Sequence, residues 1–270
     1  MWEEQFGWLS AAAARQQGLI TAAQAARLGV DGAAIARFGS VGLLEELDWT
    51  VYRLAGSSYG DRYAHPYAAW LALDPERFRW ERPEAAERDA VLSHQSACAV
   101  IGLGAVAATG IRFVAATARP SPRTVTVTAA PVTPHEIVRY EGIPVTSAHR
   151  TILDLLAEWT PREEIAGVCG DAVRRDLLRL RPFYEDVLDI AEEYGLPTGG
   201  RHFVDYFLPG LRPETLSVRN LRDFAEIVYP AQVAEVRPAI ERIIADVRPA
   251  PAGELAAELA AELVGRARHH

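Results

Sequence analysis

Residues 18–38, GLITAAQAARLGVDGAAIARF, decide the fold expected for the N-terminal part of this chain. Thr21 is a good N-cap for a helix that stops at Gly29, because its hydroxyl can accept an unpaired backbone N–H. After a tight turn, Asp31 can cap a second helix that runs from Gly32 to about Phe38. Two short helices joined by a glycine-containing turn predict a helix-turn-helix.

The flanking residues complete a winged helix. Apolar residues at helical spacing over Trp8–Gln17 predict a preceding helix. Two short β-rich stretches, residues 43–47 and 51–54, surround a polar turn and predict a hairpin, the wing. We therefore expect residues 1–56 to form a winged helix-turn-helix DNA-binding domain.

The whole chain is expected to be α+β, because strand-like alternation at Thr124–Thr128 is embedded among helical patterns. A helical C-terminal region follows, and its repeated Glu-Leu-Ala-Ala over Glu254–Leu263 predicts an amphipathic helix able to dock on the body or on a partner. The charged string Glu81–Asp89 is expected to be solvated. The predicted divisions are the winged helix at 1–56, a connector at 57–89, a mixed α+β domain at 90–180 and a helical region at 181–270.

Composition excludes several classes of function. The 270 residues include 28 basic ones, all arginine, so chemistry that needs a lysine ammonium is excluded. A net charge of −8 argues against non-specific coating of DNA, but leaves a local, sequence-reading contact open. There is no apolar run long enough for a membrane span, and the acidic start lacks the basic region of a secretory signal, so we expect a cytoplasmic protein.

Enzyme motifs are absent from the sequence. The seven histidines and two cysteines show no metal-ligand spacing, and no Gly-x-Ser-x-Gly elbow occurs. Gly39-Ser40 is not followed by the acidic pair that a nucleotidyltransferase needs to hold Mg²⁺. We expect no enzyme activity, no catalytic residue, no metal and no cofactor, although an unrecognised enzyme stays open as an alternative.

The helix-turn-helix prediction assigns candidate DNA contacts. The second helix would enter the major groove, where Arg37 is the best candidate for a bidentate contact with guanine. The wing carries Glu45, Glu46 and Asp48, which phosphate would repel, so either the wing points away from DNA or the module has another role. The predicted DNA-binding residues are Thr21, Gln24, Arg27, Gly32, Ala33, Arg37, Ser40 and Arg53.

A second group of residues has a structural or a partner-contact interpretation. Thr146 or Ser147 can cap a helix that starts near residue 148, and Arg150 can pair with Asp154 four residues later on that helix. Ser93 would begin another helix with His94 in its first turn. We favour a structural role for these residues and keep contact with a partner open, chiefly for Arg150.

The chain resembles a known family in several separate stretches. These are Gly18–Val30, Val51–Gly56, Leu92–Leu103, Gly142–Asp154 and Asp171–Arg175, which together cover about residues 10 to 180. Their order is similar to that of the AbiEi-like antitoxins of abortive-infection (type IV) toxin–antitoxin systems. This chain departs from the family pattern at the recognition helix and wing, which are usually arginine-rich there.

The resemblance implies a DNA-binding transcriptional autoregulator. Its N-terminal domain would repress its own operon by binding an inverted-repeat operator DNA, with a homodimer as one expected form. The second domain would serve to neutralise a cognate nucleotidyltransferase-type toxin, with or without direct contact. The alternative is an antitoxin module that acts by protein interaction and does not bind an operator.

Overall fold

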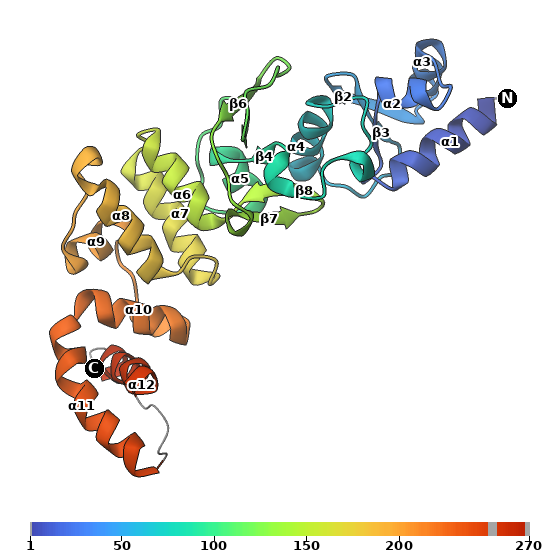
Figure 1. Cartoon of the computed structure of the whole chain (residues 1–270). Helices are drawn as coiled ribbons and strands as arrows, with labels where there is room; N and C mark the ends of the chain where they lie inside the picture. The colour runs from blue at the N-terminus through green and yellow to red at the C-terminus, as the bar shows by residue number, and fades with distance from the viewer. Residues whose placement is uncertain (1, 248–252, 268–270) are drawn as a thin grey trace. The chain divides into compact units, whose positions relative to one another are not determined.

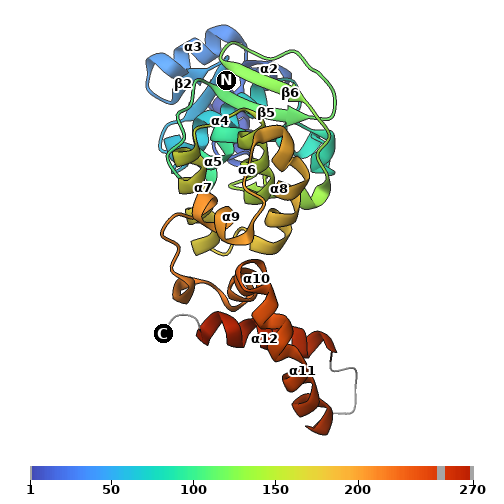
Figure 2. The ribbon, with the colours of Figure 1, turned by 90° about the vertical axis from the view of Figure 1, so that its left-hand side faces the viewer.

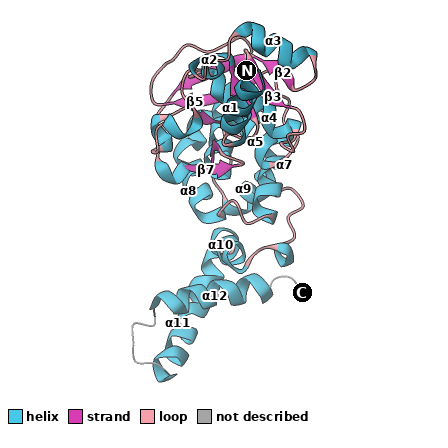
Figure 3. Ribbon diagram, turned by 90° about the vertical axis from the view of Figure 1, so that its right-hand side faces the viewer, coloured by secondary structure: helices cyan, strands magenta, loops and turns pink. Residues whose placement is uncertain are grey.

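The fold is mixed α+β, as predicted, in a computed structural model that describes residues 2–247 and 253–267. The chain divides into two compact units. Unit 1 comprises the chain up to Gly102 together with Ala107–Ser147, and unit 2 comprises Leu103–Val106 together with the chain from Ala148 onward. Within the described residues the strands belong to unit 1 and unit 2 is helical (Figure 3).

Unit 1 begins with the winged helix that the sequence predicts. Its three strands form an antiparallel sheet in the order β1-β3-β2, and the hairpin turns at Trp49 and Thr50, which have φ values of 53° and 57°. Leu9, Ile35 and Phe38 meet in the core of this part of the unit. The elements are α1 (Trp2–Ala14), β1 (Leu19–Thr21), α2 (Ala22–Arg27), α3 (Gly32–Ser40), β2 (Leu44–Asp48) and β3 (Val51–Leu54).

A five-stranded sheet forms the second part of unit 1, in the order β6-β5-β4-β8-β7. The pairs β5–β6 and β4–β8 are parallel, and the other two pairs are antiparallel. Sequence analysis predicted β6 but not β5. The elements are β4 (Val91–Leu92), α5 (His94–Ile101), β5 (Ile111–Ala115), β6 (Val125–Ala129), η3 (Pro134–Glu136), β7 (Ile137–Tyr140) and β8 (Ile143–Thr146).

Residues 57–89 are more than a connector. They contain α4 (Asp61–Ala72), which packs against strands of both sheets and lies between them in Figure 1. Its Tyr67 and Leu71 are fully buried. The 3-10 turns η1 (Arg79–Glu81) and η2 (Ala86–Arg88) follow. Because one helix contributes to both cores, the predicted domain and connector form a single unit.

The expected solvation of Glu81–Asp89 is wrong for two of its residues. Arg82 and Asp89 are 7% and 4% exposed, and two hydrogen bonds of 2.8 and 2.7 Å join the guanidinium to the carboxylate. Arg82 also donates to the carbonyl of Trp70 at 3.0 Å. A buried ion pair of this kind needs such additional hydrogen bonds to offset the loss of hydration.

Unit 2 begins at Ala148, whereas the sequence placed a division near residue 180. Its early helices, α6 and α7, pack on each other and on later ones, with Phe183, Phe203 and Phe207 in ring contact. The elements are α6 (Ala148–Ala157), α7 (Arg162–Arg174), α8 (Leu180–Tyr194), α9 (Gly200–Phe207), η4 (Pro213–Thr215), α10 (Val218–Val228), α11 (Pro230–Val247) and α12 (Gly253–Ala267).

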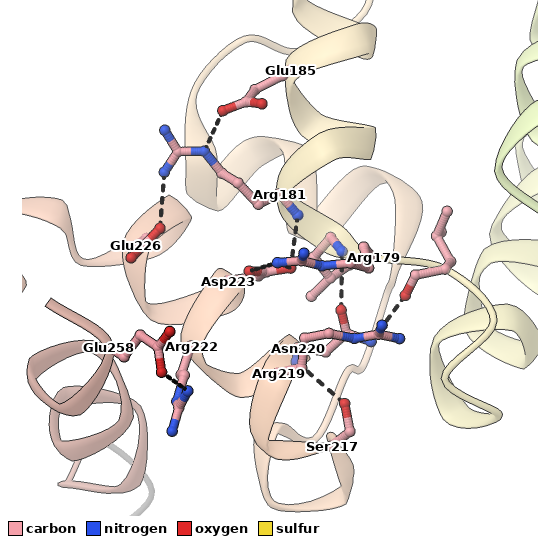
Figure 4. Close-up of polar contacts among 12 residues, drawn as sticks. Arg179, Arg181, Glu185, Ser217, Arg219, Asn220, Arg222, Asp223, Glu226 and Glu258 are labelled. Carbon is pink, nitrogen blue, oxygen red and sulfur yellow. Dashed lines mark hydrogen bonds and ion pairs between the residues drawn. The ribbon is translucent and has the colours of Figure 1, made fainter. Parts of the chain in front are cut away.

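A polar cluster fastens the start of α10 to the segment before α8 (Figure 4). The buried Asn220 accepts a hydrogen bond from the backbone of Leu180 at 3.0 Å and donates to the carbonyl of Leu178 at 2.9 Å. Asp223 accepts from Arg179 at 3.1 Å, and Ser217 caps α10 by accepting the N–H of Asn220. These bonds satisfy the backbone groups that a helix end leaves unpaired.

The amphipathic helix predicted near the C-terminus is present as α12, which packs against α10 and α11 (Figure 2). Its buried face consists of small residues such as Ala260, Ala261 and Gly265. Leu259 and Leu263 are 37% and 52% exposed. The helix therefore docks on the body of this chain, which is one of the two expectations, and it does so through its small residues rather than through these leucines.

Candidate nucleic-acid interface

The recognition helix α3 has one buried and one exposed face. Ile35 and Phe38 are buried in the winged-helix core, while Gly32, Ala33 and Arg37 are exposed. Asp31 caps the helix as predicted, because its carboxylate accepts the N–H of Ala34 at 2.8 Å. An exposed N-terminal half made of small residues allows the backbone to approach a groove closely.

Arg37 lies on the exposed face, where its guanidinium carbon is 5.4 Å from the ring centroid of Trp2 on α1. This cation–π contact orients the side chain without neutralising its charge. Ser40 is exposed too, and its hydroxyl donates to the carbonyl of Arg37 at 2.8 Å. The residue predicted to contact guanine is thus accessible to a ligand.

Thr21 and Gln24, by contrast, are not available to phosphate, because both are buried. They form a capping box in which the Thr21 hydroxyl accepts the backbone N–H of Gln24 at 3.0 Å. In return, the side-chain Oε1 of Gln24 accepts the backbone N–H of Thr21 at 3.1 Å. The Thr21 hydroxyl also donates to the backbone carbonyl of Pro75 at 2.5 Å, and the side-chain amide of Gln24 donates to that of Arg77 at 2.8 Å. Their predicted role as DNA contacts is corrected to a structural one, which the spacing Thr-x-x-Gln could have indicated.

Arg27 is half-exposed, but its charge is matched within unit 1. Two hydrogen bonds, of 2.6 and 2.9 Å, join its guanidinium to the carboxylate of Glu81. These bonds, with one from the Phe78 N–H, lower the pKa of Glu81 to about 2, and Glu81 in turn raises the pKa of Arg27. The predicted phosphate contact of Arg27 would require this pair to open.

The wing is held by internal ion pairs. Arg53, 16% exposed, contacts Glu45 at 2.7 Å and Asp61 at 2.6 Å, and bonds to these two carboxylates raise its pKa. Arg53 is therefore engaged by carboxylates rather than presented to phosphate, which corrects its predicted role. At the tip, Asp48 contacts Arg123 at 3.1 Å and the Trp49 indole donates to the Arg123 carbonyl at 2.8 Å.

The pKa of Asp48 is lowered at this tip, first by the backbone N–H of Trp49 and then by Arg123. The side chain of Arg123 lies just before β6, so the wing tip is fastened to the second sheet of the same unit. Of the two interpretations of the acidic wing, this arrangement favours a wing that points away from DNA.

The remaining predicted residues have structural contacts. Arg150 bonds Asp154 at 2.7 Å on α6, as the four-residue spacing predicts. Ser93 is the N-cap residue of α5, and its hydroxyl lies 2.9 Å from Nδ1 of the buried His94. Thr146 is fully buried at the end of β8.

Among residues 2–247 and 253–267, three or more histidine, cysteine or acidic side chains nowhere gather closely enough to hold a metal ion. Across the same residues, each helix is too short or too polar to cross a membrane.

Comparisons with known proteins give a distant structural likeness. No family model matches this chain, and no curated protein matches it. Among solved structures, it is similar to the crystal structure of the RV2827C protein from Mycobacterium tuberculosis. The two chains are 15% identical, the match covers 83% of this chain and 81% of the other, and the TM-score is 0.45.

Proposed function

We propose that this chain is a cytoplasmic DNA-binding transcriptional regulator that contacts the major groove through the exposed face of α3. The observation that carries the proposal is the solvent-facing Arg37 on a capped helix of 9 residues whose opposite face, with Ile35 and Phe38, is buried in the core. A rigid helix with one free guanidinium fits guanine, which offers two acceptors at the groove edge.

The charge distribution favours specific over non-specific binding. The chain is strongly acidic as a whole, and two of the arginines predicted to meet phosphate, Arg27 and Arg53, pair with carboxylates instead. A single protomer would therefore bind weakly. A homodimer on an inverted repeat doubles the base contacts and supplies the affinity that one α3 lacks.

The antitoxin role is a further part of the proposal and is supported by the sequence resemblance. Repression by unit 1 would adjust expression of an operon that encodes a nucleotidyltransferase-type toxin. The helical unit 2 offers exposed apolar residues on α12, such as Leu259 and Leu263, to a protein partner.

A binding assay with the DNA upstream of the gene tests the proposal. Arg37→Ala should weaken binding to the operator by about 1–3 kcal/mol, while affinity for random duplex changes little. Arg88→Ala removes the same charge from an exposed residue of η2, outside the winged helix, and should leave operator affinity unchanged. Equal affinity of the unaltered protein for operator and random DNA at several salt concentrations would refute the proposal.

The negative charge of the wing, which phosphate would repel, favours a second candidate, an antitoxin module that acts by protein interaction without an operator. Full-length Arg37→Ala protein separates the two functions in toxin-arrested cells. Under the second candidate the variant rescues growth as the unaltered protein does, and neither protein protects the upstream DNA from cleavage in a footprint. Under the first, the footprint is present and Arg37→Ala removes it.

A further inference from the structure

A hollow in unit 1, away from α3, has the lining of an anion site. Its volume is about 480 Å³, within the range of cavities that hold small organic ligands. Arginines reach it from three separate parts of the unit: Arg15 follows α1, Arg79 lies in η1 and Arg139 lies in β7. Four arginines line the hollow in all, against the two carboxylates of Glu84 and Asp89.

Three of the four arginines that line this hollow have no acidic partner among the described residues. Elsewhere in the described chain, several guanidinium groups do have an acidic partner, as in Arg27–Glu81, Arg53–Asp61 and Arg222–Glu262. Within residues 2–247 and 253–267, Arg15, Arg79 and Arg139 form no ion pair within 4 Å. Three unmatched cations that line one hollow repel one another, and an anion among them would relieve that repulsion.

The two carboxylates do not cancel this charge. Asp89 is already held by Arg82 at 2.7 Å and by Arg119 at 3.3 Å, and it also accepts the N–H of Ala90. Its negative charge is therefore matched before any ligand arrives. Glu84 is exposed, and its carbonyl rather than its carboxylate accepts from Arg139, at 3.5 Å.

A second, independent observation comes from Trp70, which lines the hollow. The side chain is 2% exposed, yet its Nε1 donor has no hydrogen-bond partner among the described residues. The Arg82 guanidinium lies 4.0 Å over its ring and fixes the indole in place. A buried donor without an acceptor is costly, and buried polar groups in native proteins are generally bonded to protein, water or a ligand.

Trp80 adds a fixed aromatic wall. Its ring stacks on Phe78 with centroids 4.6 Å apart and planes at 6°, and the Arg15 guanidinium lies 4.0 Å from its centroid. The hollow is larger than a bare phosphate needs, and its lining combines aromatic and cationic groups. That combination suits a ligand with an organic part as well as a charged one.

We propose that this hollow binds a small phosphorylated organic anion of nucleotide size, whose phosphate groups contact Arg15, Arg79 and Arg139. Guanidinium groups bind phosphate oxygens in pairs, and several arginines favour a di- or triphosphate over a monovalent anion. The site is independent of the proposed DNA contact on α3.

Isothermal titration of the full chain with ATP, GTP, pyrophosphate and inorganic phosphate tests this inference. We expect at least one nucleotide to bind more tightly than both pyrophosphate and inorganic phosphate, and binding to weaken as salt rises. Arg79→Gln and Arg139→Gln should each raise the Kd about tenfold or more. Arg88→Gln, an exposed arginine that does not line the hollow, is the matched control and should leave the Kd unchanged.

The inference is overturned if none of the four anions binds, or if Arg88→Gln weakens binding as much as Arg139→Gln. It is also overturned if duplex DNA alone binds and Arg139→Gln reduces that binding, because the arginines would then serve the nucleic acid.

Discussion

Helices α3 and α12 are both amphipathic, yet they bury opposite kinds of side chain. The first places the large Phe38 in the core and leaves Gly32 and Ala33 exposed. The second buries alanines and a glycine and leaves Leu259 exposed. Hydrophobicity alone therefore does not decide which face of a helix meets the rest of the protein.

The spacing between helices explains the difference. On α12, a Cβ placed at Gly265 would lie 2.9 Å from the Cγ of Leu221 on α10, so the helices approach too closely for a larger side chain. On α3, the core has room for an aromatic ring, and Phe38 meets Phe6 edge to face with centroids 5.2 Å apart. Small residues permit close packing, and large ones fill a wider gap.

The largest loss of stability should come from removing the ring of Phe38 from the core of the winged helix. Phe38→Ala is expected to reduce the free energy of unfolding by about 3–5 kcal/mol, because it removes a buried ring and leaves a cavity. Leu259→Ala, on the exposed face of α12, should change it by less than about 0.5 kcal/mol. Urea denaturation followed by circular dichroism measures both, and equal losses would contradict the contrast between the two helices.

A larger side chain on the buried face of α12 should cause the next largest loss of stability. Ala261→Leu inserts a large side chain into the close interface of α12, so we expect a loss of about 1–3 kcal/mol in the free energy of unfolding. Ala267→Leu makes the same change at an exposed position of the same helix and should be close to neutral. A neutral Ala261→Leu would show that this interface can open to admit a leucine.

Acid should produce the smallest loss of stability. Glu81 in η1, which pairs with α2 of the winged helix, and Glu262 on α12 have lowered pKa values, chiefly through hydrogen bonds from Arg27 and Arg222. A carboxylate whose pKa is lower in the folded state stabilises the fold at pH values above its ordinary pKa of about 4.5. That stabilisation is lost as the pH falls, for Glu81 down to about 2.

The melting temperature of Glu81→Gln should accordingly depend less on pH below about 4.5 than that of the unaltered protein. Glu46→Gln changes an exposed glutamate of the wing and is the control. If the three proteins lose stability in parallel as the pH falls, the Arg27–Glu81 pair contributes nothing to the acid response.

Local patterns predicted the local features of the fold. The caps at Thr21 and Asp31, the hairpin that follows α3, and the Arg150–Asp154 pair are all present. Each depends on residues within four positions of one another or on one turn, so the local sequence is sufficient to predict it. The strand β5 and the burial of Arg82 with Asp89 were missed, because both depend on what packs against them.

In the candidate sites too, some features follow from the local sequence and others depend on tertiary packing. The sequence alone determined that α3 is a capped helix with Arg37 on its polar side, because helical periodicity places that residue opposite Ile35 and Phe38. Only the tertiary structure decided that the side chain of Gln24 is buried against the carbonyl of Arg77, that Arg27 is matched by Glu81, and that three distant arginines line one hollow. Contacts across 49 or more residues, such as that from Arg27 to Glu76, depend on how the chain packs, and no local pattern encodes them.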